Sequence, residues 1–447
     1  MTEAKVAGQG SLLIITIVVL VDMIGFGIII PFLTFMVAHL SGPDAEIGFW
    51  VATLMSGYAA AVFLFSSFWG SLSDKYGRRP ILMIGLLGNT GTFILFGLST
   101  TLWMAFVARV LSGIFNANIP VARAYISDVS KPHEVAKRQG LLGVAFGVGF
   151  TIGPALGGWL SRPADWNWTS IFQDTIFDSN PYLLPCIASS LLSGVAFLLS
   201  IWWLPESLPA ESRSKTKNTN PLGELKRKFK DIFALLSRPI LSPLMWSAMA
   251  FWVGYTIMHV SFILFTMMSP QQGGLGFSES DNGLVFGFIG LSGLLVQGVL
   301  IGPLTTRFGS SRLMAFGLVS AAIGLTLTPY VDISFAWFGI LLVSFMIALG
   351  NGLFTPSNLA MLSNHSGFSE KGLVMGVAES LRSLSTLVGV LIGGLIWDLT
   401  NTEQGFFTYH TVFWLCGIFS IIGLFIHVFG GAWNADDPAL EGVGIDE

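Results

Sequence analysis

The sequence predicts an all-α membrane protein with twelve transmembrane helices in two pseudo-symmetric six-helix bundles. Composition is the first reason, because 53% of the residues are hydrophobic and only 11% are charged, whereas soluble proteins carry about 25% charged residues. The second reason is that apolar runs recur, each of about 20 residues and therefore able to cross a hydrocarbon core of about 30 Å as a helix. The third is a charged turn that occurs at matching places in the two halves of the chain.

The apolar runs give the positions of the spans. We place them at residues 12–38, 48–72, 80–99, 102–127, 139–160, 183–204, 241–267, 282–305, 312–330, 334–362, 373–396 and 409–430. The 52 glycines suit close helix contacts in lipid.

Charge distribution predicts the orientation of the spans. Lys and Arg cluster in alternate loops, such as residues 75–79 and 215–238, while the opposite loops are acidic apart from Arg162. The excess of positive charge in cytoplasmic loops therefore predicts that both termini are cytoplasmic. This orientation requires an even number of spans, which twelve satisfies. We expect a multi-pass protein of a cell membrane, the bacterial inner membrane.

The spans divide the chain into four segments. These are an N-terminal six-helix bundle at 1–204, a cytoplasmic linker at 205–240, a C-terminal six-helix bundle at 241–430 and an acidic tail at 431–447. Within the linker, apolar residues recur at helical spacing from Leu222 to Leu236 with Lys and Arg between them. We expect an amphipathic helix on the inner leaflet, with a protein-docking helix as the alternative.

The charged turn links the second and third spans. Its sequence is Gly70-Ser71-Leu72-Ser73-Asp74-Lys75-Tyr76-Gly77-Arg78-Arg79, and Gly302 to Arg312 repeats it without the acid. A charge at the edge of a membrane needs a partner, and Asp128 at the inner end of span four is the partner expected for Arg78 or Arg79. We interpret the turn as a conformational latch made of Gly70, Asp74, Gly77, Arg78, Arg79 and Asp128.

This repeated turn, with its spacing G-x-x-x-D-x-x-G-R-R, resembles that of the major facilitator superfamily. The resemblance implies a two-lobed secondary transporter in which one lobe rocks against the other around a mid-membrane site. Nearly the whole chain fits the resemblance.

Span five contains a dense set of small residues and a proline. The set is Gly149, Gly153, Pro154, Gly157 and Gly158. Small residues let helix backbones touch, and the proline removes one helical hydrogen bond and bends the span. The pattern resembles the signature of drug–proton antiporters, and that resemblance implies export.

Ionisable residues inside spans are rare and indicate function. Those proposed for proton coupling are Asp22, Arg109, Glu379 and Arg382. Glu379 and Arg382 are three residues apart on one helix face and are expected to pair, either as part of the site or as a structural pair. Asp22 is the predicted proton carrier, because a carboxyl group in an apolar cavity exchanges a proton near neutral pH.

Span one around Asp22 resembles tetracycline–proton antiporters, as does Arg109 in Arg109-Val110-Leu111-Ser112-Gly113. The resemblance implies that Arg109 senses or assists proton transfer. The chain departs from those antiporters in span three, where Asn89 and its neighbours include no carboxylate. Residues 177–186 are similar to plant zinc-induced-facilitator-like carriers, which would imply export of metal chelators or organic acids.

Polar residues on other spans suggest a substrate cavity. They are Asn116, Asn118, His259, Gln297, Asn351 and Asn358. With Arg123 of span four included, arginines in the spans outnumber acids three to two, so the cavity is expected to favour an anionic or zwitterionic compound. Each residue alone is equally compatible with hydrogen bonding between helices.

These observations predict a proton-coupled exporter of a small organic compound. A proton-coupled importer of a nutrient such as an amino acid or nucleoside shares every feature except the span-five pattern, and a non-transporting membrane receptor is the alternative of another class. An enzyme is not expected, since the sequence lacks a visible nucleophile–base pair, a metal cluster and a G-x-x-x-x-G-K-[ST] phosphate loop. We therefore expect no metal and no cofactor beyond the proton gradient, no nucleic-acid partner, and a monomer in contact with lipid.

Overall fold

The computed structural model describes residues 9–42, 46–116, 118–130, 134–208, 213, 232–366, 370–400 and 407–433. Twelve of its helices are long and apolar enough to cross a membrane, which confirms the predicted all-α class and the number of spans. The chain forms two compact units, described separately below. Unit 1 comprises residues 1–217 and 277–287, and unit 2 comprises residues 218–276 and 288–447.

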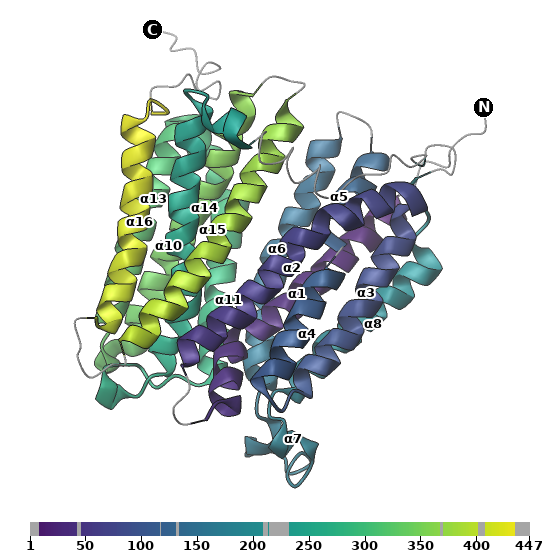
Figure 1. Ribbon diagram of the computed structural model, residues 1–447, viewed down its shortest axis with the longest axis vertical. Coiled ribbons are helices and arrows are strands. Elements are labelled where there is room, and N and C mark those ends of the chain that lie inside the picture. Colours follow the sequence, from purple (N-terminus) through teal and green to yellow (C-terminus); the bar gives the residue numbers. More distant parts are fainter. Residues whose placement is uncertain are drawn as a thin grey trace. The chain divides into compact units, whose positions relative to one another are not determined.

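Unit 1 contains the first six spans (Figure 1). Its helices are α1 (Gln9–Leu40), α2 (Ile47–Tyr76), α3 (Arg78–Gly97), α4 (Leu102–Phe115), α5 (Asn118–Asp128), α6 (Val135–Leu160) and α8 (Leu183–Trp203), with the short η1 (Pro163–Asp165) and α7 (Ile176–Ser179) after α6. Span four is thus built from two helices, because α4 ends in Asn116, whose ψ of 65° is not helical.

Unit 2 contains the remaining spans. Its main helices are α10 (Leu241–Met267), α11 (Glu279–Leu295), the π-helical η4 (Val296–Leu300), α12 (Ile301–Phe308), α13 (Ser310–Leu327), α14 (Ala336–Asn364), α15 (Lys371–Leu399) and α16 (Tyr409–Phe429). Span eight runs from α11 through η4 to α12, and its first turns, residues 277–287, belong to unit 1.

The two units repeat one packing pattern. In unit 1, α1 packs against α6 and α8, and α3 packs against α8 and α4. In unit 2, α10 packs against α15 and α16, and α13 packs against α16 and α14. The repeated turn also has the same backbone in both copies, since Gly77 has φ 104° and ψ 160° and Gly309 has φ 77° and ψ 158°. Only glycine adopts this region without strain.

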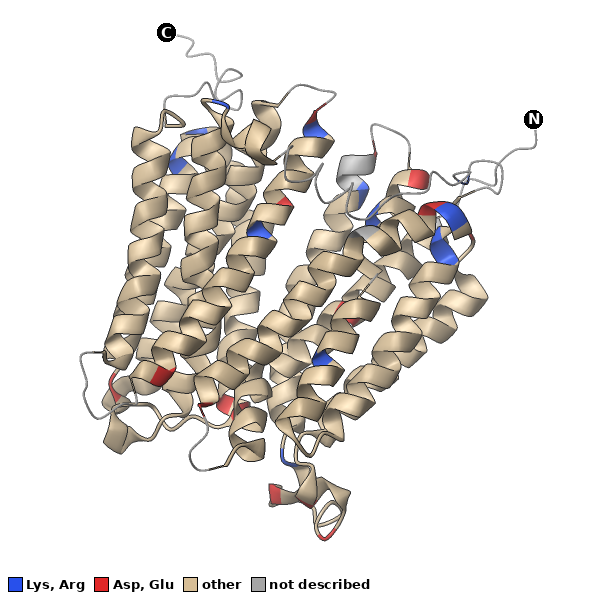
Figure 2. Cartoon of the chain, in the orientation of Figure 1, with Lys and Arg blue, Asp and Glu red and all other residues tan. Residues whose placement is uncertain are grey.

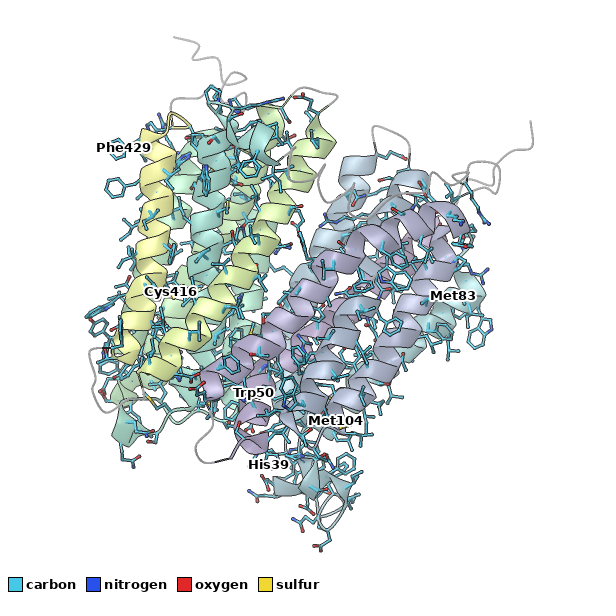
Figure 3. All side chains as sticks on the ribbon, viewed as in Figure 1. His39, Trp50, Met83, Met104, Cys416 and Phe429 are labelled. Carbon is cyan, nitrogen blue, oxygen red and sulfur yellow. The ribbon has the colours of Figure 1, made fainter. Side chains whose placement is uncertain are left out.

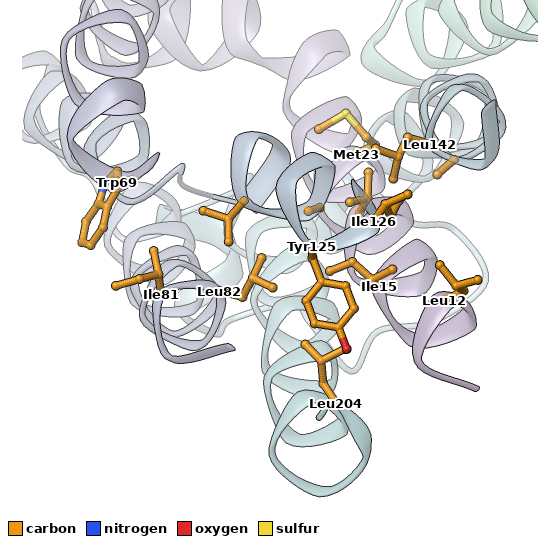
Figure 4. Close-up of a cluster of buried hydrophobic side chains, with 14 residues drawn as sticks. Leu12, Ile15, Met23, Trp69, Ile81, Leu82, Tyr125, Ile126, Leu142 and Leu204 are labelled. Atoms are coloured by element: carbon orange, nitrogen blue, oxygen red, sulfur yellow. The ribbon is translucent and has the colours of Figure 1, made fainter. Parts of the chain in front are cut away.

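A core of buried apolar side chains lies behind the charged turn of unit 1 (Figure 4). It joins Trp69 of α2 and Ile81 of α3 to Ile126 of α5 and Leu142 of α6. Tyr125 is fully buried in this cluster, and its hydroxyl donates to the carbonyl of Pro205 at 2.9 Å. The core therefore fixes the ends of α3, α5 and α8 that lie next to the charged turn relative to one another.

Several predicted features are only partly described. Of the expected amphipathic helix in the linker, residues 232–236 are helical and the preceding part lies outside the described residues. The acidic tail beyond residue 433 also lies outside them. Most of the described Lys and Arg residues lie near the ends of the helices (Figure 2). Cys416, on α16 in Figure 3, is buried and unpaired.

Candidate functional site

Asp22 is the centre of a buried polar cluster in unit 1. Its side chain projects from α1 and the residue is 5% exposed. The carboxylate atom Oδ1 accepts two hydrogen bonds, from Nδ2 of Asn89 at 2.8 Å and from Nδ2 of Asn118 at 2.9 Å. Two helices, α3 and α5, therefore supply amide donors to one oxygen of the predicted proton carrier.

The local fold of span four places Asn118 against Asp22. Asn118 is the first residue of α5 and is fully buried. Gly85 of α3 provides the space, since a Cβ there would come within 2.5 Å of Asn118 Oδ1. Asn116, at the end of α4, instead donates its amide to the Tyr58 hydroxyl. The two predicted cavity asparagines thus have different partners.

Arg109 is buried close to the same cluster. It is 5% exposed, and its guanidinium carbon lies 4.3 Å from the ring centre of Tyr58 and 5.9 Å from that of Phe96. Its Nε has no hydrogen-bond partner, and no carboxylate of the described chain forms an ion pair with it. Aromatic faces stabilise the cation through their quadrupoles, so its charge stays available to a group that enters.

A cavity of about 20 Å³ separates these groups. It is lined by Asp22, Phe26, Ile29, Tyr58, Asn89, Phe93, Arg109, Ser112 and Asn116. A polar cavity of this size holds about one water molecule. A single water molecule in this cavity can therefore lie next to both the Asp22 carboxyl group and the Arg109 guanidinium.

The polar residues predicted on unit 2 are placed differently. Asn358 is buried and donates to the carbonyl of Leu244, which joins α14 to α10. Asn351 accepts from the Thr355 hydroxyl one turn away. His259 packs edge-on against Tyr255, and Gln297 is exposed on η4. In the described part of this unit, Asn358 therefore acts as a link between helices.

Glu379 and Arg382 form the expected pair on α15. Arg382 Nε lies 2.9 Å from Oε2 of Glu379, and a second contact joins Nη2 to Oε1. The Arg382 guanidinium also lies 5.1 Å from the ring centre of Trp252 on α10. The Arg382 side chain is 42% exposed and that of Glu379 is 54% exposed.

The charged turn contains the expected pair of Asp128 with one of the two arginines, and a second ion pair, to Asp74, that was not predicted. Arg78 Nε lies 2.9 Å from Oδ2 of Asp128, and its Nη1 lies 2.6 Å from Oδ1 of Asp74. Arg79 donates to the carbonyl of Ile201 in α8. Gly70 lies in α2 with open space where a Cβ would be.

Glu206 is a residue of this turn that sequence reasoning missed. Its carboxylate accepts the backbone N–H of Arg78 at 2.8 Å and that of Arg79 at 3.2 Å. An anion at a helix N-terminus satisfies unpaired donors and is favoured by the helix dipole. The sequence did offer a signal for this contact. Glu206 comes directly after span six, in a loop on the same side as the loop that carries the two arginines.

The glycines of α6 provide close contacts with two other elements of unit 1. A Cβ at Gly149 would meet Met23, one at Gly153 would lie 2.7 Å from the carbonyl of Ile24, and one at Gly157 would lie 2.0 Å from that of Ile28. Pro154 lies inside the helix among them. On another face, a Cβ at Gly158 would lie 2.4 Å from the carbonyl of Glu279. The pattern thus brings α6 against both α1 and the start of α11.

A match to a family model decides the family. Residues 15–300 and 295–441 match the model of the Major Facilitator Superfamily. The chain belongs to the major facilitator superfamily.

Curated relatives of this superfamily cover most of the chain. The class C tetracycline resistance protein of Escherichia coli is 27% identical over 95% of this chain and 98% of its own length. The zinc-induced facilitator-like 1 protein of Arabidopsis thaliana is 28% identical over 88% of this chain and 85% of its own. Both resemblances drawn from the sequence are therefore confirmed.

A solved structure shares the fold. The human organic anion transporter MFSD10 superposes with a TM-score of 0.66 at 19% identity, covering 94% of this chain and 99% of the other. The protein is accordingly a multi-pass transporter of the major facilitator superfamily and not an enzyme. Membership implies a small-molecule substrate and a lipid environment.

A second cluster missed by sequence reasoning lies at the other end of unit 1. Glu279 is 8% exposed, and its Oε1 accepts from the Tyr182 hydroxyl at 2.9 Å and lies 3.1 Å from Nε of Arg162. Burial, followed by the charge of Glu279, raises the pKa of the Tyr182 hydroxyl. In this superfamily member, the cluster attaches residues 277–287 to the segment between α6 and α8.

Proposed function

We propose that this protein is a proton-coupled antiporter that exports a small organic compound by alternating access. The observation that carries the proposal is the buried Asp22, held by Asn89 and Asn118 beside a cavity for one water. A carboxyl group inside a membrane is costly and is retained for function. A water molecule in this cavity would offer the Asp22 carboxyl group a route for a proton.

Arg109 supports the same proposal. It lines the cavity with Asp22 but forms no ion pair with it at 4.0 Å or less. A cation that approached Asp22 would favour the ionised carboxylate and oppose its protonation. Movement of Arg109 relative to Asp22 would therefore change how readily the proton leaves.

The direction of transport is supported by relatives. A tetracycline resistance protein aligns over 95% of this chain, and α6 carries the glycine and proline pattern that resembles drug–proton antiporters. The proposed substrate class is a drug-like compound, an anionic or zwitterionic metabolite, or a metal chelator. We also propose a monomer in the inner membrane with both termini cytoplasmic.

Transport in everted membrane vesicles tests the proposal. With the lumen acidified, an antiporter should accumulate substrate from a panel of antibiotics, siderophores and amino acids, and substrate addition should release protons. Asp22→Asn should abolish accumulation driven by the proton gradient. The matched control is Asp174→Asn, which changes an exposed acid of the loop after α6 and should transport normally. An importer would instead lose substrate from the acid lumen, and unchanged transport by Asp22→Asn would contradict the proposal.

A further inference from the structure

Asp22 and the charged turn are joined by two helices that run side by side. Helix α3 carries Arg78 at the turn and Asn89 at the level of Asp22, while α5 carries Asn118 at Asp22 and Asp128 at the turn. At 1.5 Å per residue, each path is about 15–17 Å long. The hydrogen bonds at Asp22 and the ion pair of Arg78 with Asp128 therefore close a ring.

The two helices of this ring differ in how easily they can shift within their spans. Asn89 lies inside the continuous 20-residue helix α3. Asn118 begins an 11-residue helix that follows the non-helical Asn116. Because α4 does not continue into α5 through Asn116, α5 can shift with less cost to the rest of its span.

The amide of Asn118 is placed to respond to a proton. An ionised carboxylate only accepts hydrogen bonds, so the amide must present Nδ2 to it. Asn118 Oδ1 is buried and has no partner within the described chain. A protonated Asp22 is a donor, and a rotated Asn118 amide would offer it this unused acceptor.

We propose that Asn118 detects the protonation state of Asp22 and that α5 transmits it to the ion pair of Asp128 with Arg78. The inference rests on the proposed function only in assigning the proton to Asp22. Asn118 is a positioning residue in this scheme, because it acts through Asp22 and through α5.

The far end of α5 is coupled to the turn by one contact and to the segment after α8 by two. Asp128 Oδ2 lies 2.9 Å from Arg78 Nε and accepts from the Ser207 hydroxyl at 3.0 Å. The Tyr125 hydroxyl donates to the carbonyl of Pro205. A shift or rotation of α5 must therefore change the contacts of the turn and of the segment after α8.

Other groups near Asp22 must be considered in any pH response. Tyr58 of α2 and Arg109 of α4 line the same cavity, and Cys186 of α8 lies within electrostatic range of Arg109. Helices α3 and α5 contribute the neutral amides of Asn89 and Asn118. Helix α6 contributes Gly149, which lies against Met23, the residue after Asp22 on α1. A response that follows Asp22 is separated from the others by the Asp22→Asn variant.

Two measurements on the full-length protein in lipid nanodiscs test the inference without a substrate. Infrared spectra taken at a series of pH values report the carbonyl band of a protonated carboxylic acid, assigned to Asp22 by its loss in Asp22→Asn. Hydrogen–deuterium exchange, corrected for the intrinsic pH dependence of amide exchange, reports the protection of residues 118–130 and 204–208. In the wild-type protein the two signals should change over the same pH interval.

The asparagines provide a matched pair of variants, since each donates to the same oxygen. In Asn89→Leu the pH interval should move, but the two signals should still change together. In Asn118→Leu the infrared band should still titrate, while the pH-dependent step in the exchange of α5 is lost. Asn118→Ser should behave as Asn118→Leu does and replaces it in the test if the leucine variant does not fold. Asn118→Gln, which keeps an amide, should restore part of the pH-dependent step in the exchange of α5.

Two results would overturn the inference. One is an exchange step in α5 that persists unchanged in both Asn118→Leu and Asn118→Ser. The other is a wild-type protein in which Asp22 titrates while α5 shows no step, and this result leaves the proposed function intact. If no infrared band depends on Asp22, both the inference and the proposed proton site fail.

Discussion

Gly77 and Glu206 are in direct contact across the charged turn, and a Cβ on Gly77 would lie 2.3 Å from Oε2 of Glu206. The same glycine has φ 104° and ψ 160°, a region that other residues enter only with strain. Two independent reasons therefore require glycine at this position. One is the path of the chain, and the other is the carboxylate that caps α3.

Replacing Gly77 should destabilise the protein. We expect Gly77→Ala to cost about 1–3 kcal/mol from backbone strain, with an added cost from displacement of Glu206. The midpoint of thermal unfolding in detergent measures the effect. Gly70→Ala is the control, because Gly70 is helical with open space at its Cβ position, and it should be neutral or slightly stabilising.

A double-mutant cycle separates the two reasons. Glu206→Ala alone should cost about 0.5–2 kcal/mol through loss of the cap on α3. The combination of Gly77→Ala with Glu206→Ala should cost less than the sum, because the clash is gone while the strain remains. Strict additivity would show that the contact with Glu206 is unimportant.

The glycines of α6 should differ sharply in their tolerance of a methyl group. Gly157→Ala places a Cβ 2.0 Å from the carbonyl of Ile28, and Gly158→Ala places one 2.4 Å from that of Glu279. Overpacking against backbone costs about 1–3 kcal/mol, so both variants should lower the unfolding midpoint. Gly143→Ala on the same helix has nothing within 4 Å and should not. Equal behaviour of the three variants would contradict the packing described here.

The cluster around Glu279 predicts an alkaline limit to stability. Burial and then the charge of Glu279 raise the pKa of Tyr182 above the value of about 10 for an unfolded tyrosine. Its contribution to folding is therefore complete below pH 10 and is lost as pH rises toward the folded-state pKa. Tyr182→Phe should remove part of the fall in unfolding midpoint between pH 9 and pH 11 (an interval set by that reference value of about 10).

Phenylalanine is a fair replacement in this test, because the Tyr182 ring stacks on Phe32 with centres 5.3 Å apart and would still do so. The control is Tyr76→Phe, which changes a tyrosine that is 51% exposed. That variant should follow the wild-type pH curve. A Tyr182→Phe curve with the wild-type alkaline slope would rule out this role of the hydroxyl.

An ion pair of unit 2 predicts that residues 232–238 become less ordered at low pH. Arg238 binds Glu370 with two contacts of 2.7 and 3.0 Å, and this hydrogen bonding lowers the pKa of the Glu370 carboxyl. The stabilisation is therefore present above the unfolded-state value of about 4.3 and is lost as pH falls below it.

Hydrogen exchange of residues 232–238 measures this limit. Exchange should increase on acidification in the wild-type protein and should already be increased at neutral pH in Glu370→Gln. Glu134→Gln is the control, since Glu134 pairs with Arg138 only four residues away and leaves this segment untouched. Unchanged exchange in Glu370→Gln would show that other contacts order the segment.

The sequence predicted the spans well because their length and polarity follow from the membrane alone. It also predicted that Asp128 would contact Arg78 or Arg79, because charges at a membrane edge need partners, and the structure shows the contact with Arg78. Asn89 was interpreted only as a missing acid. Its true role depends on Asp22, 67 positions away, and no local pattern reports a contact at that distance. Glu206 and Glu279 were missed for the same reason.

The interruption of span four has no counterpart in the corresponding span of the other half. There, α14 runs unbroken from Ala336 to Asn364, even with Pro356 inside it. Over the described residues the two halves thus share one scaffold, but only the first interrupts this span next to the buried Asp22. A hybrid protein built from two copies of the second half would keep the architecture and lose the part for which we propose a response to a proton.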